Sequence, residues 1–184
     1  GGSARGGASN SPLSSGKGSV YEGGIRVPAV IRWPGVLPAG KKLDQLTTVH
    51  DLFPTLATAL GVKPGNKKPF YGQDLWKAFR TGKTIPHKDV LIASQAIALF
   101  HGEWKLIQGQ GTGGRPGYKE LYLINSDPEE RFDLSEVYPE LTEALGAIID
   151  RFPKGEPLSR GRGRQGRRQQ GGSRPQPPRQ QQQP

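Results

Sequence analysis

A lysine between two glycines is the residue of this chain best suited to chemistry. Lys17 lies between Gly16 and Gly18. Its ammonium, with an ordinary pKa of about 10.4, stays charged at neutral pH as a compact cation on a flexible stem. Flanking glycines allow positive φ and let backbone N–H groups approach a ligand closely. The combination suits an oxygen of a sulfate or phosphate group. The same three residues taken alone also fit a solvated lysine in a Gly/Ser loop.

The residues that follow this lysine favour structural roles over catalysis. Gly23-Gly24 predicts a tight turn, and Glu22 beside it can cap backbone donors or pair with Arg26. The segment Val27 to Trp33 is rich in β-branched and aromatic residues and ends at Pro34-Gly35, so it predicts a strand with Trp33 in the core.

The run from Gly16 to Gly35 resembles the sulfatase family. The resemblance covers about residues 9–152, and five further motifs carry it: Asn10-Ser11-Pro12-Leu13, Asp51-Leu52-Phe53-Pro54-Thr55-Leu56, the turn Phe70-Tyr71-Gly72-Gln73-Asp74-Leu75, Trp104-Lys105-Leu106-Ile107 and the segment Glu120 to Glu130. One departure is Asp133, where the family commonly has Asn before the leucine. Asn10 is interpreted as loop structure rather than as a ligand.

The resemblance implies an alkaline-phosphatase-like α/β fold and hydrolysis of a sulfate ester, with Lys17 as the catalytic residue that contacts the sulfate. It also implies a divalent cation, calcium, and a formylglycine nucleophile made from a Cys or Ser. Their ligands and precursor are expected upstream of Gly1, so no residue of this chain is predicted to bind metal, and the chain by itself is expected to be inactive. An exported protein, periplasmic or extracellular, and a sulfated polysaccharide substrate are further expectations from the resemblance.

Two other functions stay open on the sequence. The same superfamily fold also hosts hydrolysis of phosphate or phosphonate esters. A catalytically inert protein that binds polyanions through a basic tail is the third alternative. The sequence indicates neither the oligomeric state nor the identity of the ester.

Downstream segments predict one helix, a small antiparallel sheet and a second helix. Asp51 can cap the first helix, with Pro54 in its first turn and Gly61 at its end. His50 next to Asp51 suggests a general base, but an adjacent pair defines no geometry. The predicted strands are Val90 to Gln95, Ile97 to Phe100, Trp104 to Gln108 and Leu121 to Leu123. After Pro139, an apolar stripe at helical spacing predicts a helix that packs across this sheet, with Leu141, Leu145, Ile148, Ile149 and Phe152 on one side.

The loop between the last two strands is the predicted rim of the substrate pocket. Residues 108–119 contain five glycines and the basic side chains of Arg115 and Lys119. Both are predicted substrate-binding residues, since basic charge on a flexible loop suits a large anionic substrate. An exposed hairpin loop without a role is the alternative.

Composition divides the chain into three predicted parts. Residues 1–85 are expected to be the end of the main α/β domain, residues 86–153 a C-terminal subdomain, and residues 154–184 a disordered Arg/Gly/Gln/Pro-rich tail. This tail holds eight Lys or Arg and one acidic residue, and so most of the formal net charge of +10. It resembles segments that bind nucleic acid, but it contains no aromatic residue for base stacking, which favours a solvated extension. The sequence has no Cys, no Met and no long apolar run.

Overall fold

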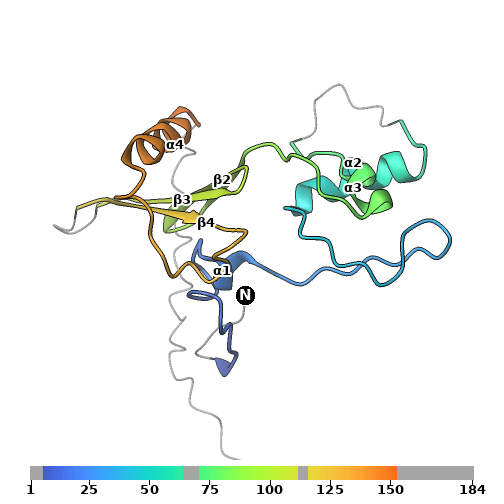
Figure 1. Ribbon diagram of the computed structural model, residues 1–184, viewed down its shortest axis with the longest axis horizontal. Coiled ribbons are helices and arrows are strands. Elements are labelled where there is room, and N and C mark those ends of the chain that lie inside the picture. The colour runs from blue at the N-terminus through green and yellow to red at the C-terminus, as the bar shows by residue number, and fades with distance from the viewer. Residues whose placement is uncertain (1–5, 64–70, 112–115, 153–184) are drawn as a thin grey trace, which may run out of the picture. The chain divides into compact units, whose positions relative to one another are not determined.

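The computed structural model of the chain describes residues 6–63, 71–111 and 116–152. Along the chain, a one-turn helix is followed by two helices, a four-stranded sheet and a final helix, coloured from blue to orange in Figure 1. The elements are α1 (Glu22–Ile25), α2 (Val49–Ala59), α3 (Trp76–Thr81), β1 (Val90–Ala93), β2 (Ala96–His101), β3 (Trp104–Gly109), β4 (Tyr118–Leu123) and α4 (Pro139–Arg151).

The four strands form an antiparallel meander in the order β1-β2-β3-β4. The register pairs Leu99 of β2 with Leu106 of β3, and Leu106 with Leu121 of β4. Gly102, at φ +60°, makes the turn between β2 and β3, a conformation that glycine adopts without a steric penalty. The predicted sheet and its strand order along the chain are therefore confirmed.

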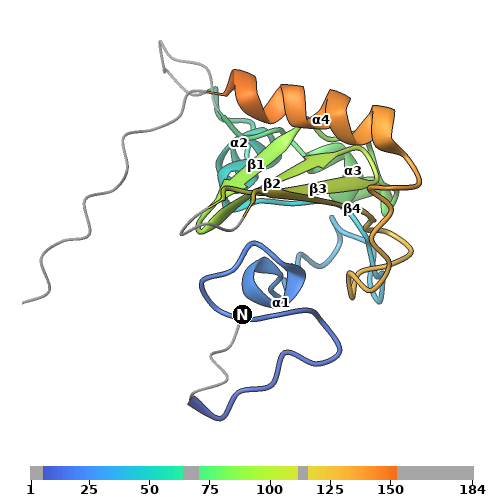
Figure 2. The same cartoon turned by 90° about the vertical axis from the view of Figure 1, so that its left-hand side faces the viewer.

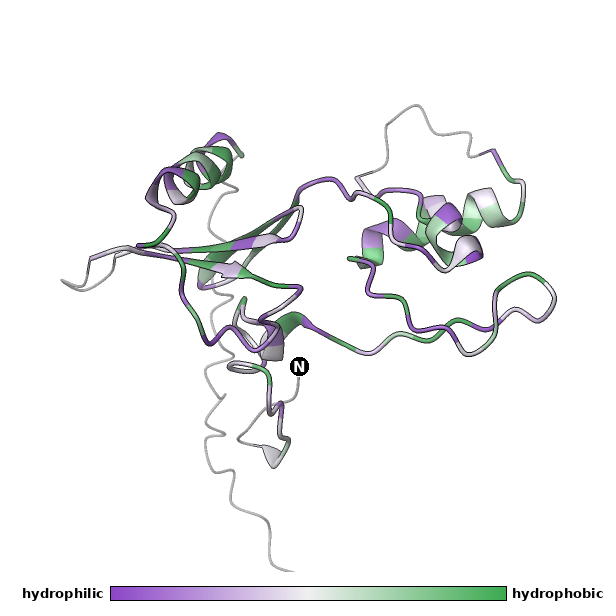
Figure 3. Ribbon diagram, viewed as in Figure 1, coloured by the Kyte–Doolittle hydropathy of each residue, from purple (hydrophilic) through white to green (hydrophobic). Residues whose placement is uncertain are grey.

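One face of the sheet packs against α4. Leu99, Leu106 and Leu121 are completely buried there and share a cluster with Leu145 and Ile149 of the helix. Polar and apolar sides of α4 are distinct in Figure 3, as expected for a helix with one buried stripe. Pro139 is the first residue of α4, where its missing N–H costs nothing. The predicted helix across the sheet is thus observed.

The opposite face of the sheet holds α1 and the two residues before it, Val20 and Tyr21. Val20 is buried against Ala98, Ile107 and Tyr122, which point away from α4 because side chains alternate along a strand. Figure 2 shows α4 over one face and α1 at the other. Residues near the start of the chain are therefore packed directly on the sheet.

The helix predicted to begin at Asp51 begins earlier. Thr48 is the N-cap of α2, and Asp51 is its third residue: the two form a capping box in which each side chain satisfies the other's backbone N–H. Asp51 does cap the helix, but from inside its first turn. Pro54 accordingly lies within α2 rather than at its start, and Gly61, at φ +66°, follows its end.

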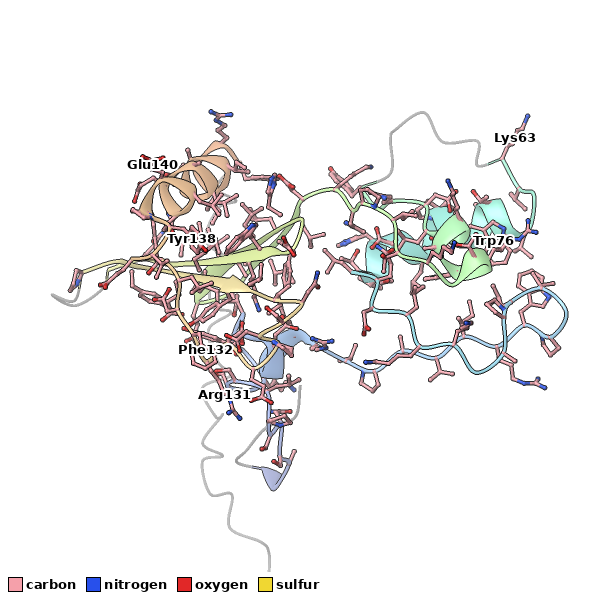
Figure 4. The ribbon with its side chains drawn as sticks, viewed as in Figure 1. Lys63, Trp76, Arg131, Phe132, Tyr138 and Glu140 are labelled. Carbon is pink, nitrogen blue, oxygen red and sulfur yellow. The ribbon has the colours of Figure 1, made fainter. Side chains whose placement is uncertain are left out.

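The strand predicted at Val27 to Trp33 is not formed. No strand pairs with these residues in the described part of the chain, and the side chain of Val30 is 96% exposed. A β-branched run becomes a strand only when a neighbour completes its backbone hydrogen bonds. Trp33 is half-buried and contacts Trp76 of α3, with ring centroids 5.6 Å apart. Figure 4 labels Trp76 on that short helix.

Several predictions concern residues outside the described ranges. Arg115, Phe70 and the tail from residue 154 lie there. The chain divides into Gly1–Phe152 and Pro153–Pro184 by its internal contacts. The predicted boundary between residues 85 and 86 stays a prediction. Among the described helices, none has the length and apolar character needed to cross a membrane.

Candidate functional site

Lys17 lies on a tight loop, residues 14–19, which we call the lysine loop. Within it, the backbone N–H and the hydroxyl of Ser19 both donate to the Gly16 carbonyl, at 3.1 and 2.9 Å. From outside, the Ser94 hydroxyl donates to the Gly18 carbonyl at 2.7 Å. Gly18 has φ +95°, so a side chain at this position would be strained. The loop is therefore fixed from within and from the end of the sheet.

The glycine pair of α1 is the surface on which the lysine loop rests. The Gly23 N–H donates to the Ser14 carbonyl at 2.8 Å. A Cβ atom on Gly23 would clash with the carbonyl oxygens of Ser14 and Ser15. One on Gly24 would lie 2.5 Å from the Ser19 carbonyl oxygen and 2.7 Å from that of Gly16. Only glycine permits this approach, which explains why two glycines follow Glu22.

The lysine loop leaves the side chain of Lys17 accessible. Lys17 is exposed, and no described residue forms an ion pair or hydrogen bond with its ammonium. The other lysines of the sheet region are paired: Lys105 with Glu22 and Glu130, and Lys119 with Glu143. An accessible cation on a fixed backbone is the arrangement expected of an anion contact.

Glu22 has a structural role, as predicted, but the sequence missed its main partner. The carboxylate meets Arg26 at 3.3 Å and, on its other oxygen, the Lys105 ammonium at 2.8 Å. Lys105 also pairs with Glu130 at 2.7 Å, is completely buried, and lies 4.9 Å from the centre of the Phe100 ring. Glu130 accepts the Glu22 N–H at 2.8 Å. We call Glu22, Lys105 and Glu130 the buried triad.

Burial dominates the electrostatics around α1. It raises the pKa of Glu130 above its ordinary value, and the hydrogen bond from Lys105 opposes this only partly. Burial also raises the pKa of Tyr21, whose hydroxyl donates to the Glu120 carboxylate at 2.6 Å. Both groups are held within hydrogen-bonded contacts and serve to fix α1 on the sheet.

Lys119 lies on the other face of the sheet. Its ammonium is 2.7 Å from the Glu143 carboxylate of α4, and it packs against Gly146. Lys17 belongs to a loop packed on α1, at the face away from α4. The structure therefore does not bring the predicted substrate-binding residues Lys17 and Lys119 together. Arg115, the third of them, lies outside the described residues.

Asp51 pairs with His87 rather than with its sequence neighbour. His50 is exposed, whereas His87 Nε2 lies 3.1 Å from Asp51 Oδ2. Thr48, through its N–H and hydroxyl, and the N–H of Gln73 also donate to the Asp51 carboxylate, at 2.6 to 2.8 Å. Burial alone would raise the pKa of Asp51, but these donors outweigh it and lower the pKa. The carboxylate joins three separated segments, a structural role.

Replacing Asp51 by Asn is expected to destabilise the full-length protein by about 2 kcal/mol at neutral pH, because the new NH₂ group must face a donor. Folding lowers the pKa of Asp51, so its contribution is complete above the unfolded value of about 4 and is lost as the pH falls through the lower folded value. Urea unfolding at pH 7 and at about pH 3 should therefore show a smaller difference between variant and wild type in acid. The exposed Asp44, paired with Lys42 at 3.4 Å, supplies the control Asp44→Asn. An equal difference at both pH values would contradict the assignment.

The described residues offer no metal site. No three His, Asp or Glu side chains gather there in a way that could hold a metal ion, and the sequence contains no cysteine. The donor set of this part of the chain therefore does not fit a calcium ion, and no described residue is assigned as a metal ligand.

The chain resembles known proteins of one family. The family model described as Sulfatase matches residues 2–62. The N-acetylgalactosamine-6-sulfatase of Canis lupus familiaris is 40% identical over 169 residues, covering 77% of this chain and 32% of that protein. The steryl-sulfatase of Homo sapiens is 44% identical over 69 residues, covering 38% of this chain and 12% of that protein.

Solved structures agree with the sequence relatives. The crystal structure of Ps i-CgsB in complex with k-i-k-neocarrahexaose has a TM-score of 0.69 and 30% identity, and the match covers 82% of this chain and 34% of that one. The chain spans about a third of the length of the curated relatives that it matches over most of its own length. The predicted alkaline-phosphatase-like α/β fold and the predicted resemblance are both confirmed. By its motifs, its fold and its relatives, this chain belongs to the sulfatase family.

Proposed function

We propose that the full-length protein that carries this chain hydrolyses a sulfate ester and that Lys17 contacts the sulfate group. The observation that carries the proposal is the exposed Lys17 side chain, which no described residue pairs, on a loop fixed by Ser19, Ser94 and the glycine pair of α1. A cation held in place before the reaction stabilises the negative charge that grows on the ester oxygens in the transition state.

The proposed substrate is a sulfate ester on a carbohydrate, including sulfated polysaccharides. Two kinds of relative support this class: N-acetylgalactosamine-6-sulfatases from several mammals, and the structure determined with neocarrahexaose. The likeness to steryl-sulfatase extends over a shorter part of the chain. An exported location, periplasmic or extracellular, belongs to the same proposal and is supported by the family alone.

Arg115 and Lys119 remain predicted substrate contacts, with less support than Lys17. Lys119 would have to leave Glu143 before it could bind a sulfate, and it lies on the face of the sheet opposite α1. A divalent cation, calcium, and a formylglycine also belong to the proposal through the family. When bound, the cation would neutralise charge on the sulfate oxygens. No described residue is proposed to hold either group.

The proposed function is tested by comparing matched esters. The full-length protein is assayed with 4-nitrophenyl sulfate, 4-nitrophenyl phosphate and N-acetylgalactosamine 6-sulfate, with release of inorganic sulfate or phosphate as the readout. We expect kcat/KM to be highest for a sulfate ester, with the carbohydrate ester above the aryl one. Faster release of phosphate would favour a phosphate ester hydrolase, and no hydrolysis of any ester would contradict the proposal.

A further inference from the structure

The buried triad closes a ring of hydrogen bonds around the first residue of α1. Lys105 donates to one oxygen of Glu22 at 2.8 Å and to one oxygen of Glu130 at 2.7 Å. The second oxygen of Glu130 accepts the backbone N–H of Glu22 at 2.8 Å. Backbone and side chain of Glu22 are thus fixed together by groups from β3 and from the connection between β4 and α4. Figure 4 labels Arg131 and Phe132 directly after Glu130 on this connection.

The helix that carries Glu22 depends on such an anchor. α1 has only four residues, and its N-cap, Tyr21, forms no side-chain cap. Helices this short are not stable by themselves, since nucleation fixes several residues for each hydrogen bond gained. Two other contacts hold the segment, Val20 in the sheet cluster and Tyr21 on Glu120, but both precede α1. The position of α1 itself therefore depends on Glu22.

The lysine loop in turn depends on α1. Gly23 donates to the Ser14 carbonyl, and Gly24 is in close contact with Ser19 and with the Gly16 carbonyl. A shift of Glu22 would move both glycines, and the backbone on each side of Lys17 would follow. Contacts at this spacing leave no room for an independent adjustment, because packed backbone atoms transmit small displacements.

We propose that Lys105 is a positioning residue for Lys17, which it fixes through Glu22 and the glycine pair. The inference rests on the proposed contact between Lys17 and the sulfate. The charges of the triad add to the effect of Lys105: without its ammonium, the two buried carboxyl groups cannot both stay ionised, and the ion pair that fixes the side chain of Glu22 is lost. Half-exposed Arg26, at 3.3 Å, is the only other charged partner of Glu22 among the described residues.

The test is a double-mutant cycle in the full-length protein, with Lys105→Met and Lys17→Ala measured singly and together for kcat and KM. Misplacing a contact by about 1 Å costs roughly 10²-fold in rate, so Lys105→Met alone should lower kcat by about that factor. In the Lys17→Ala background the same substitution should change kcat by less than about threefold, because residues that act as a unit are not additive.

Two further variants separate positioning from stability. Leu145→Ala opens a cavity in the core on the α4 face and should leave kcat of the folded protein near the wild-type value. The double variant Lys105→Met/Glu130→Gln removes one charge of each sign and so leaves no excess of buried negative charge. It replaces Lys105→Met in the test if that single variant does not fold. This pair should lower kcat only when Lys17 is present.

The outcomes distinguish the inference from the function on which it rests. Equal losses of kcat from Lys105→Met with and without Lys17 would make Lys105 a structural residue only and overturn the inference. Unchanged turnover in Lys17→Ala alone would overturn the proposed contact between Lys17 and the sulfate, and the inference with it. A loss confined to proteins that contain Lys17 supports both.

Discussion

Replacing Lys17 by Ala is expected to lower kcat of the full-length protein for a sulfate ester by roughly 10²–10³-fold, the usual cost of removing one preorganised contact to developing charge. No described residue neutralises this ammonium, so its charge is available to a ligand. The loop is fixed by hydrogen bonds from Ser19, Ser94 and Gly23, so little rearrangement has to precede the reaction. Steady-state kinetics with N-acetylgalactosamine 6-sulfate measure the effect.

Lys42→Ala is the matched control for this prediction. Lys42 is also an exposed lysine, paired with Asp44 at 3.4 Å, and its loss should change kcat by less than about twofold, as expected for a surface ion pair. Turnover of Lys17→Ala within that same range would remove Lys17 from the catalytic machinery. Unfolding temperatures of both variants should match the wild type, because neither side chain contributes to the core.

Replacing Gly24 by Ala is expected to lower turnover by about 10²-fold. The added methyl would lie 2.5 Å from the carbonyl oxygen of Ser19 and 2.7 Å from that of Gly16, well inside van der Waals contact. Both are atoms of the lysine loop, so the clash is relieved only by moving Lys17 or α1. A displacement of about 1 Å at a reacting group is enough for a loss of this size.

Gly6→Ala is the control for the loss of backbone flexibility that any glycine-to-alanine substitution causes. A Cβ atom on Gly6 would meet nothing within 4 Å, so turnover and stability should stay close to the wild type. Gly24→Ala should also lower the free energy of unfolding by about 1–3 kcal/mol, the range for overpacked sites. Kinetics on the folded fraction, determined by circular dichroism, separate the two effects. Full activity in Gly24→Ala would show that the contact between α1 and the loop has no bearing on Lys17.

The elements predicted most closely are those that are indicated by a residue pattern within their own segment. The stripe through Leu145 and Ile149 indicated α4, and both residues are buried on the sheet. Two short strand-like segments joined by a glycine turn indicated β2 and β3, and Gly102 has the positive φ that the turn requires. In α4 the period of the sequence matches the face that becomes buried, whereas β2 and β3 are buried on both faces.

The elements predicted wrongly depend on distant partners. Val27 to Trp33 has the composition of a strand but no described neighbour to pair with it, so composition alone misled. The predicted start of α2 is too late, because Thr48 is the N-cap and forms a capping box with Asp51, three residues further on. The spacing Thr48-Val49-His50-Asp51 is the local signal for this start.

Part of the candidate site followed from the sequence, and part required the fold. Lys17, the glycine pair and the pairing of Glu22 with Arg26 lie within one short stretch. Lys105 does not: nothing in Trp104-Lys105-Leu106 distinguishes a lysine buried between two carboxylates from one facing solvent. The alternation of β3 places it on the face away from α4, where α1 brings Glu22 to it. The separation of Lys119 from Lys17 depends on the same alternation in β4.

Inhibition by inorganic sulfate tests most directly whether Lys17 holds a sulfate group. The inhibition constant is measured for the wild type, Lys17→Ala and Lys42→Ala of the full-length protein under the same salt conditions. A charge-assisted hydrogen bond contributes about 1.5–3 kcal/mol, so Lys17→Ala should bind sulfate roughly tenfold to a hundredfold more weakly, whereas Lys42→Ala should match the wild type. Equal inhibition of all three proteins would contradict the account, since Lys17 would then make no contact with the anion.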